Sequence, residues 1–171
     1  MFSRLLPNQY VKSIYDIDLF SLKDRGIRAV ITDLDNTLVE WHRAEATPEV
    51  KEWFAKLEET GLNVTIVSNN SEKRVKEFCD PEEKVFIHSA KKPRRKAFKR
   101  ACKQMGVRTD EAVVIGDQIF TDVLGGNRAG LYTILVVPVT KTDDWMTKLN
   151  RRMERFVLRW MKKKGHINWE D

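Results

Sequence analysis

Two aspartates separated by one residue are the side chains of this chain best suited to phosphate chemistry. Asp33 and Asp35 come shortly after the apolar run at 29–31, and Thr37 ends the motif. Such a run is typical of a buried parallel strand, and open α/β sheets bind ligands where their strands end. One carboxylate there can attack phosphorus while the other transfers protons. For this motif alone, the alternative is a solvated turn or a helix cap.

A second polar cluster follows the predicted strand at 63–67. Ser68 and Asn69 offer a hydroxyl and an amide that can hydrogen-bond phosphate oxygens, and the amides after them can open a helix. Ser68 also suits the N-cap of that helix, and the two roles are compatible. Capping and phosphate binding therefore both remain open for this cluster, and the motif alone favours the cap.

A lysine follows the third predicted strand, at 85–87. Lys92 stands directly before Pro93, which we expect in the first turn of a new helix. An ammonium group at this place can neutralise phosphate and carboxylates together. Because other basic residues surround it, a solvated basic run is the alternative interpretation, and the pattern alone does not separate Lys92 from Lys91.

The fourth predicted strand, at 112–116, ends in two more carboxylates, Asp117 and Asp122. Turn and cap chemistry is again the alternative. Carboxylates gathered with a lysine favour a hard divalent cation. The alternation of strands and helices along the chain predicts an α/β fold with a parallel sheet.

These four motifs, in this order, resemble those of the haloacid dehalogenase (HAD) superfamily. Residues 33–37, Ser68, Lys92 and residues 116–122 match the first to fourth motifs, and the likeness extends from about residue 28 to residue 139. The resemblance implies a Rossmann-like parallel sheet with helices on both faces. It also implies a phosphatase, because the superfamily's dehalogenases and ion pumps lack a carboxylate at the place of Asp35.

The resemblance further implies catalytic roles. Asp33 is expected to form an aspartyl-phosphate, and Asp35 to protonate the leaving oxygen and later to deprotonate water. Mg²⁺ is the expected cofactor, because it is a hard ion that one or two carboxylates hold together with phosphate and water. Its implied ligands are Asp33, Asp117 and the main-chain carbonyl of Asp35.

Supporting roles are implied for the remaining motif residues. Ser68, Asn69 and Lys92 are expected to bind phosphate. Thr37 is expected to support the site, with a purely structural role as the alternative. Asp122 is expected either to order a metal-bound water or to cap the helix that follows it.

The spacing between the motifs bears on the substrate. Superfamily members carry large cap domains after the first motif or between the second and third, and neither gap here has room for one. We therefore expect an open site without a large cap domain, suited to a macromolecular or membrane-bound substrate. The short loop after the first motif contains Trp41 and His42, and we interpret His42 as an ordinary surface histidine.

The basic character of the chain is concentrated near its end. The segment 145–164 carries eight of the 31 lysines and arginines against one acidic residue, in a chain of net charge +6. Its apolar residues form a helical stripe: Trp145, Met146, Leu149, Met153, Phe156, Val157, Trp160 and Met161. Such a basic amphipathic helix can lie in a membrane interface, pack on the sheet or bind RNA.

At the other end of the chain, apolar residues precede the first predicted strand and offer a second apolar surface: Phe2, Leu5, Leu6, Tyr10, Val11, Ile14 and Tyr15. This surface slightly favours membrane contact. Over its whole length the chain most resembles the YqeG-type phosphatases of HAD subclass IIIA, relatives of the mitochondrial phosphatidylglycerophosphatase. The likeness adds Leu6-Pro7 and Asn127-Arg128 to the four motifs. It implies a lipid phosphate monoester, phosphatidylglycerophosphate, as substrate and an anionic lipid head group as partner.

Length and composition indicate a single HAD-like domain over residues 1–171, since 42% hydrophobic residues supply enough core. No apolar stretch approaches the roughly 20 residues needed to cross a bilayer, and no signal peptide is apparent. We expect a cytoplasmic protein, with peripheral contact at the inner face of the membrane as one role for the basic helix. Cys79 and Cys102 are expected to be free thiols.

Two other classes of function remain open. A soluble capless phosphatase would act on a sugar phosphate or a nucleotide. A non-enzymatic protein on the same scaffold would use the basic helix to bind lipid or RNA. The intact pair Asp33 and Asp35 argues against the second class, and nucleic acid is the less favoured partner.

Overall fold

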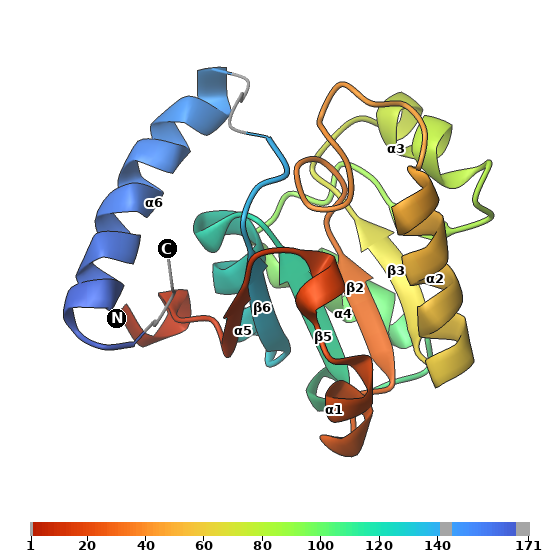
Figure 1. Ribbon diagram of the computed structural model, residues 1–171, viewed down its shortest axis with the longest axis horizontal. Helices are drawn as coiled ribbons and strands as arrows, with labels where there is room; N and C mark the ends of the chain where they lie inside the picture. The colour runs from red at the N-terminus through yellow and green to blue at the C-terminus, as the bar shows by residue number, and fades with distance from the viewer. Residues whose placement is uncertain (1, 141–144, 167–171) are drawn as a thin grey trace.

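The computed structural model describes residues 2–140 and 145–166, and within these ranges six parallel strands form one sheet in the order β1-β6-β5-β2-β3-β4 (Figure 1). The strands are β1 (Gln9–Val11), β2 (Ala29–Thr32), β3 (Asn63–Val67), β4 (Val85–Ile87), β5 (Ala112–Gly116) and β6 (Tyr132–Val136). Each pair of neighbours is parallel. The sheet therefore confirms the predicted α/β class.

The edge strand β1 was not predicted. Residues 9–11 were expected to precede the first strand, but they form β1 at the edge of the sheet, where Tyr10 is paired with Leu135 of β6. The strand is only three residues long and half-buried along its length, so it lacks the continuous apolar run that marks the others. Its place beside β6 brings the start of the chain next to the last strand.

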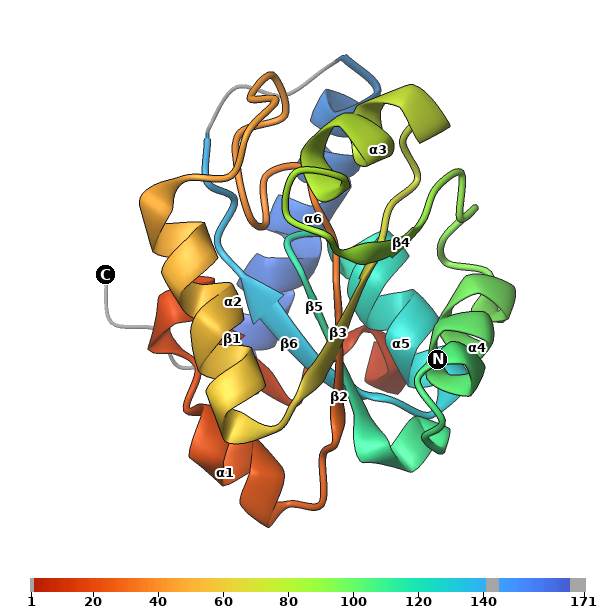
Figure 2. The same ribbon diagram turned by 90° about the vertical axis from the view of Figure 1, so that its right-hand side faces the viewer.

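Helices cover both faces of the sheet, as Figure 2 shows with the sheet seen on edge. The α-helices are α1 (Leu19–Asp24), α2 (Pro48–Thr60), α3 (Glu72–Cys79), α4 (Arg95–Gln104), α5 (Leu124–Ala129) and α6 (Trp145–Lys163). Short helical turns are η1 (Phe2–Leu5), η2 (Ile14–Asp16), η3 (Thr109–Glu111) and the π-helical η4 (Ile119–Val123). The layers are those of a doubly wound fold.

Alternation along the strands divides the interior into two cores. Val30 of β2 packs in one core with residues of α1, α2 and α3, whereas Ile31 packs in the other against Phe98 of α4. Successive side chains of a strand point to opposite faces, so a strand covered on both faces is apolar at every position. This is why the first three residues of β2, at 29–31, form an unbroken apolar run.

Two helices start next to a proline, in different ways. Thr47 caps α2 by accepting a hydrogen bond from the amide of Val50, and Pro48 occupies the first helical position. Pro93 was expected in the first turn of a helix, but α4 begins at Arg95. Pro93 instead lies in the turn before it, joined to Lys92 by a cis peptide bond.

The order of the strands fixes where a ligand can bind. From β2 the chain moves outward through β3 to β4, and it then returns to the other side of β2 to form β5 and β6. The strand order therefore reverses between β2 and β5, and ligands of such sheets bind in the crevice at the carboxyl ends of the strands there. Thr32 lies opposite Ile115, so Asp33 and Asp117 follow neighbouring strand ends.

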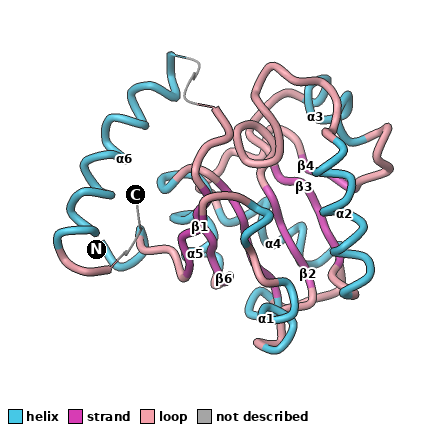
Figure 3. Tube along the Cα trace, in the orientation of Figure 1, coloured by secondary structure: helices cyan, strands magenta, loops and turns pink. Residues whose placement is uncertain are grey.

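No cap domain interrupts the described chain between the first three motifs. Only the segment 33–47 joins β2 to α2, and a single helix, α3, lies between β3 and β4. Figure 3 shows the first of these segments as a loop above the ends of the strands. The prediction of a site without a large cap is confirmed.

The predicted C-terminal helix is α6, and only part of its apolar stripe is buried. Val157 and Met161 pack with Ile119, Val123 and Leu135, while Met153 and Phe156 remain 50% and 72% exposed. The side chains of Trp145, Met146 and Leu149 lie outside the described part of the structure. In the part of the chain that is described, no helix combines the length and apolarity needed to cross a bilayer.

Candidate active site

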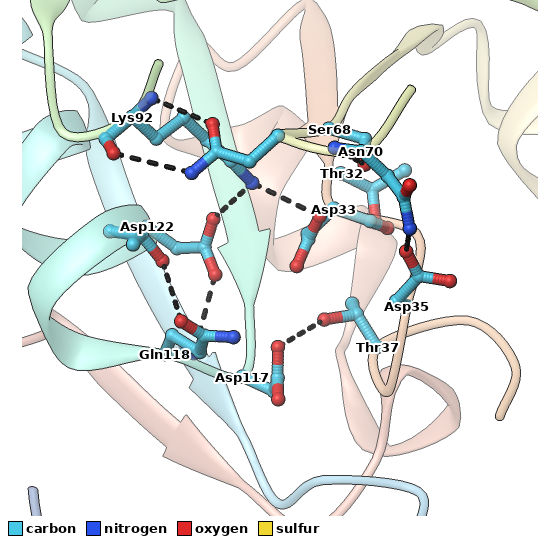
Figure 4. A network of polar contacts seen from close by, with 12 residues as sticks. Thr32, Asp33, Asp35, Thr37, Ser68, Asn70, Lys92, Asp117, Gln118 and Asp122 are labelled. Carbon is cyan, nitrogen blue, oxygen red and sulfur yellow. Dashed lines mark hydrogen bonds and ion pairs between the residues drawn. The ribbon is translucent and has the colours of Figure 1, made fainter. Parts of the chain in front are cut away.

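A buried ion cluster lies where β2 and β5 end. The Nζ atom of Lys92 is 3.0 Å from Oδ1 of Asp33 and 2.7 Å from Oδ1 of Asp122 (Figure 4). The amide of Asp33 donates to the carbonyl of Ile115, which joins the two strands at this point. Asp33, Lys92, Asp117 and Asp122 are all at most 7% exposed. The structure thus brings residues of the first, third and fourth motifs into one cluster.

Lys92, rather than Lys91, is the lysine of this cluster. Lys91 is exposed, whereas the Lys92 side chain is buried between two carboxylates. Burial by itself lowers the pKa of Lys92, but the charges of Asp122 and Asp33 outweigh it and raise the pKa above its ordinary value. The ammonium therefore stays charged across the physiological range.

Asn69 holds the backbone of Lys92. Its Oδ1 accepts from the Lys92 amide at 2.7 Å, and its Nδ2 donates to the Lys92 carbonyl at 3.3 Å. Both halves of the amide side chain are therefore engaged by the backbone of the third motif. This arrangement gives Asn69 a positioning role, and its predicted contact with phosphate stays a prediction.

Ser68 lies at the end of β3 and is 2% exposed. Its hydroxyl accepts a hydrogen bond from the amide of Asn70. The alternative that Ser68 caps the next helix is wrong, because Ser71 is the N-cap of α3 and accepts from the amide of Arg74. Ser68 precedes the cap by three residues, which leaves it at the strand end near the cluster.

Asp35 is held apart from the cluster by its own partners. Arg74 donates to Oδ1 from both Nε and a terminal nitrogen, at 3.1 and 3.0 Å, and Asn70 donates to Oδ2 at 2.9 Å. Burial raises the pKa of Asp35, and the contacts with Asn70 and Arg74 act against this rise without cancelling it. A carboxyl with a raised pKa suits a group that must donate a proton and later accept one.

Thr37 links the first motif to the fourth. Its hydroxyl donates to Oδ1 of Asp117 at 3.2 Å, and the residue is buried. The turn that carries it includes Asn36, which has a positive φ of 60° and accepts at Oδ1 from the hydroxyl of Thr140. This hydrogen bond to a candidate metal ligand is compatible with the supporting role of Thr37, which stays a prediction.

Asp122 folds back over the end of β5. Its Oδ2 accepts from the amide of Gln118 at 3.2 Å, while Oδ1 accepts from Lys92. A Cβ atom on Gly116 would lie 2.2 Å from Cγ of Asp122, so only glycine fits there. Burial raises the pKa of Asp122, and Lys92 counteracts that rise. Asp122 does not cap α5, which has no side-chain cap.

Besides Arg74, the sequence analysis missed two site residues on α6. Arg151 of α6 forms an ion pair with Oδ2 of Asp117 and donates to the main-chain carbonyl of the same residue at 2.9 Å. Glu154, 4% exposed, accepts from the amide of Ile119 at 2.7 Å and from Arg151 at 3.3 Å. The single acidic residue within a basic helical segment was the signal for this contact.

The carboxylates fit a hard divalent cation. One oxygen from each of Asp33, Asp117 and Asp122 lies within 4.8 Å of the others, and the three residues are buried. An oxygen-only donor set of this kind suits Mg²⁺ better than softer metals. The carboxylate of Asp35 is occupied by Arg74 and Asn70, which is compatible with the implied use of its main-chain carbonyl alone.

Trp41 and His42 lie in the loop between β2 and α2. Their rings contact edge to face with centroids 5.4 Å apart, and both residues are exposed. Neither takes part in the hydrogen bonds of the cluster in the described structure. The interpretation of His42 as a surface histidine remains the simpler one.

Sequence comparisons assign the family. The family model described as mitochondrial PGP phosphatase matches residues 2–140. The chain is 54% identical over 166 residues to the probable phosphatase YqeG of Bacillus subtilis, covering 97% of this chain and 96% of that protein. It is 29% identical over 171 residues to phosphatidylglycerophosphate phosphatase 1 of Arabidopsis thaliana, covering 93% of this chain and 49% of that longer protein.

Solved structures support the same fold. A HAD phosphatase from Thermococcus onnurineus superimposes with a TM-score of 0.56 at 15% identity, over 70% of this chain and 90% of that one. An uncharacterized protein from Listeria monocytogenes gives 0.56 at 17% identity, over 78% and 99% of the two chains. With four motifs meeting at one switch point and a family match across most of its length, this chain belongs to the mitochondrial PGP phosphatase family and is a phosphatase of the HAD type.

Proposed function

We propose that this phosphatase is a Mg²⁺-dependent phosphate monoester hydrolase that converts phosphatidylglycerophosphate to phosphatidylglycerol. The observation that carries the chemistry is the buried cluster in which Lys92 joins Asp33 to Asp122 beside Asp117. A nucleophilic carboxylate, a fixed cation and an oxygen-rich cation site are the parts that such a reaction requires.

In the first step, a carboxylate oxygen of Asp33 attacks phosphorus and the bond from phosphorus to the leaving oxygen breaks. Asp35 gives its proton to that oxygen, so that the leaving group departs as an alcohol. Lys92 lies 3.0 Å from the attacking carboxylate and supplies positive charge toward the transferring phosphate. The hydroxyl of Ser68 and the following amides supply hydrogen bonds to the phosphate oxygens.

In the second step, water attacks the phosphorus of the aspartyl-phosphate. Asp35, now ionised, takes the proton from that water, the bond from phosphorus to Asp33 breaks, and inorganic phosphate leaves. Arg74 and Asn70 hold the Asp35 carboxylate in one orientation for both steps. Mg²⁺, when held by Asp33, Asp117 and the Asp35 carbonyl, offsets negative charge on the phosphate.

A lipid substrate is supported by the relatives and by the outer surface of the protein. The relative from Arabidopsis thaliana is named for phosphatidylglycerophosphate. The short connections around the site leave it without a large cap, so a head group can be approached at a membrane surface. Substrate identity rests on this likeness, since a fold alone does not determine function.

A candidate membrane surface lies where η1 meets α6. We call it the η1–α6 surface; its groove of about 370 Å³ is lined by Phe2, Leu5, Phe120, Arg152, Met153, Phe156 and Val157. Phe2 and Phe156 are 54% and 72% exposed. Arg152, Arg155 and Arg159 are exposed on the same helix. Exposed aromatic rings among cations suit the interface of an anionic bilayer, where each nearby cation contributes about 1 kcal/mol.

The test is phosphate release from phosphatidylglycerophosphate in mixed micelles, measured with Mg²⁺ and with a chelator. A panel of soluble phosphate monoesters and the variant Asp33→Asn are run beside it. We expect turnover of the lipid that needs both Mg²⁺ and Asp33. A clear preference for a sugar phosphate or a nucleotide would agree with phosphatase activity but contradict phosphatidylglycerophosphate as the substrate. Turnover that persists in the chelator would contradict the Mg²⁺ assignment.

A further inference from the structure

The contact of α6 with the site lies on the outer side of a candidate metal ligand. Arg151 donates to Oδ2 of Asp117 and to the main-chain carbonyl of the same residue. In Figure 4 the other oxygen, Oδ1, which accepts from Thr37, lies on the side of Asp33 and Asp122. Arg151 therefore binds Oδ2, the oxygen of Asp117 that points away from Asp33 and Asp122. Oδ1, which Arg151 does not bind, faces the other two carboxylates.

Arg151 is itself held by a buried anion. Its Nη1 is 3.3 Å from Oε2 of Glu154, and the other oxygen of Glu154 accepts from the amide of Ile119 at 2.7 Å. Ile119 begins η4, the turn that carries Asp122. Glu154 and Arg151 thus tie α6 to the first half of the fourth motif, at Asp117 and Ile119. The Arg151 and Glu154 side chains are 14% and 5% exposed, so solvent screens this chain of contacts weakly.

Val157 and Met161 fix the helix in this position. They lie on the inner face of α6 and pack with Ile119, Val123 and Leu135. Arg151, Glu154, Val157 and Met161 therefore form one inward stripe at helical spacing, polar where it meets the site and apolar beyond it. The packing of α6 therefore fixes the position of the Arg151 guanidinium, and a group that orients another side chain, here Asp117, must itself be held in place.

We propose that Arg151 is a positioning residue for metal binding, acting through Asp117. The planar guanidinium fixes the rotation of the Asp117 carboxylate, so that Oδ1 is presented to a divalent cation together with Asp33. Partners of this kind orient the ligands of metal sites, and their loss typically weakens metal affinity about 10- to 100-fold. This inference rests on the proposed Mg²⁺ site, and it assigns part of that site to a helix beyond residues 2–140, the range that the family model matches.

The test is the affinity of the full chain for Mg²⁺ alone, measured by isothermal titration calorimetry without substrate. We expect Arg151→Gln to raise the Kd for Mg²⁺ about 10- to 100-fold. Arg151→Lys keeps the charge but loses the planar two-nitrogen contact, so we expect an intermediate Kd. The matched control is Arg159→Gln, which makes the same charge change at an exposed position of α6 and should leave the Kd unchanged.

A second readout separates positioning from a general loss of structure. In the phosphatase assay, Arg151→Gln should raise the Mg²⁺ concentration needed for half-maximal rate, and excess Mg²⁺ should restore kcat. If circular dichroism shows that Arg151→Gln does not fold, the positioning role is tested with Arg151→Lys and Glu154→Gln in the same Mg²⁺ titration. We expect a raised Kd for Mg²⁺ in each of these variants.

The outcomes distinguish this inference from the proposed function. An unchanged or lower Kd in Arg151→Gln, with tight binding by the unaltered chain, would overturn the positioning role alone; a lower Kd would mean that the guanidinium competes with the metal. Absence of Mg²⁺ binding by the unaltered chain would overturn the proposed metal site and this inference with it.

Discussion

The carboxylate cluster and the η1–α6 surface both contain charged groups, but the two regions treat charge in opposite ways. In the cluster each carboxylate has a cation within the protein: Lys92 for Asp33 and Asp122, and Arg151 for Asp117. Asp35, outside the cluster, has Arg74. On the outer face of α6, no acidic side chain of the described residues pairs with Arg152, Arg155 or Arg159. These arginines are exposed beside apolar side chains that nothing described covers.

The difference shows what each region is suited to do. Buried, paired charges hold a fixed geometry, because separating them would leave an uncompensated charge in a poorly solvated place. Exposed cations beside an apolar groove hold no partner in place and remain available to an external anion. The cluster is therefore suited to chemistry and the η1–α6 surface to attachment, and the two can be disturbed separately.

The largest expected effect comes from removing the nucleophile within the cluster. Asp33→Asn should lower kcat by about 10⁴-fold or more, because no other carboxylate is placed to attack phosphorus. Folding should be preserved, since the amide is isosteric and removes one negative charge from a crowded group. Phosphate release and thermal melting measured on the same preparation check both parts. Residual hydrolysis within tenfold of the unaltered chain would contradict the covalent route.

A change in the η1–α6 surface should affect membrane binding and not the hydrolysis reaction. The double variant Met153→Ser and Phe156→Ser removes two exposed apolar side chains of the η1–α6 surface. We expect binding to anionic vesicles in a flotation assay to weaken by about tenfold or more, because apolar burial stabilises interfacial helices. Hydrolysis of a soluble monoester should be retained.

Phe20→Ser supplies the matched control for that variant. Phe20 is 71% exposed on α1, away from the η1–α6 surface, so the same kind of truncation there should leave vesicle binding unchanged. Equal losses in the control and in the double variant would show that the η1–α6 surface is not the attachment site.

Salt should separate the two regions without any mutation. Raising the ionic strength from about 0.1 M to about 1 M shortens the screening length from about 10 Å to about 3 Å. Vesicle binding should fall several-fold, because the cations of α6 are exposed. Hydrolysis of a soluble neutral-alcohol phosphate should change less, because the ion pairs of the cluster are buried. Salt-independent flotation would contradict an electrostatic contribution to attachment.

The smallest expected effect is a shift in pH dependence when a pair in the site is broken. Burial raises the pKa of Asp35, and the contacts with Asn70 and Arg74 lower it in part. Arg74→Gln removes the cation that favours the ionised form, so the pKa of Asp35 should rise further. Asp35 must be protonated to act as the acid, and it would then stay protonated to higher pH.

The alkaline limb of the kcat/KM profile in Arg74→Gln should therefore move to higher pH. The profile of the unaltered chain measured in the same buffers is the reference. A limb that stays in place or moves to lower pH would show that Asp35 is not the group whose titration sets it.

The sequence predicts most of the sheet because each central strand is a short apolar run that ends in polar residues. It also places Asp33, Lys92 and Asp117 together, since parallel strands end at the same edge of a sheet. It does not predict β1, which consists of three half-buried residues. The pairing of β1 depends on β6, which is distant in the sequence: the hydrogen bond between Asn8, just before β1, and Thr133 of β6 spans 125 positions.

The parts of the site that were missed depend on how helices dock. Arg74 reaches Asp35 from α3, and Arg151 reaches Asp117 from α6, over separations of 39 and 34 residues. In the sequence, neither arginine can be distinguished from the solvent-exposed basic residues near it. The burial of Glu154, Val157 and Met161 in the structure shows which face of α6 turns toward the rest of the protein.

Gly116 has a consequence for how this motif is recognised in other chains. Glycine at the end of a strand is commonly explained by backbone torsion, but here the restriction comes from space that the Asp122 carboxyl occupies. Gly116 and Asp122 are therefore informative as a pair. A chain with a larger residue at the first position cannot place an aspartate at the second in this way, however well the rest of its pattern agrees.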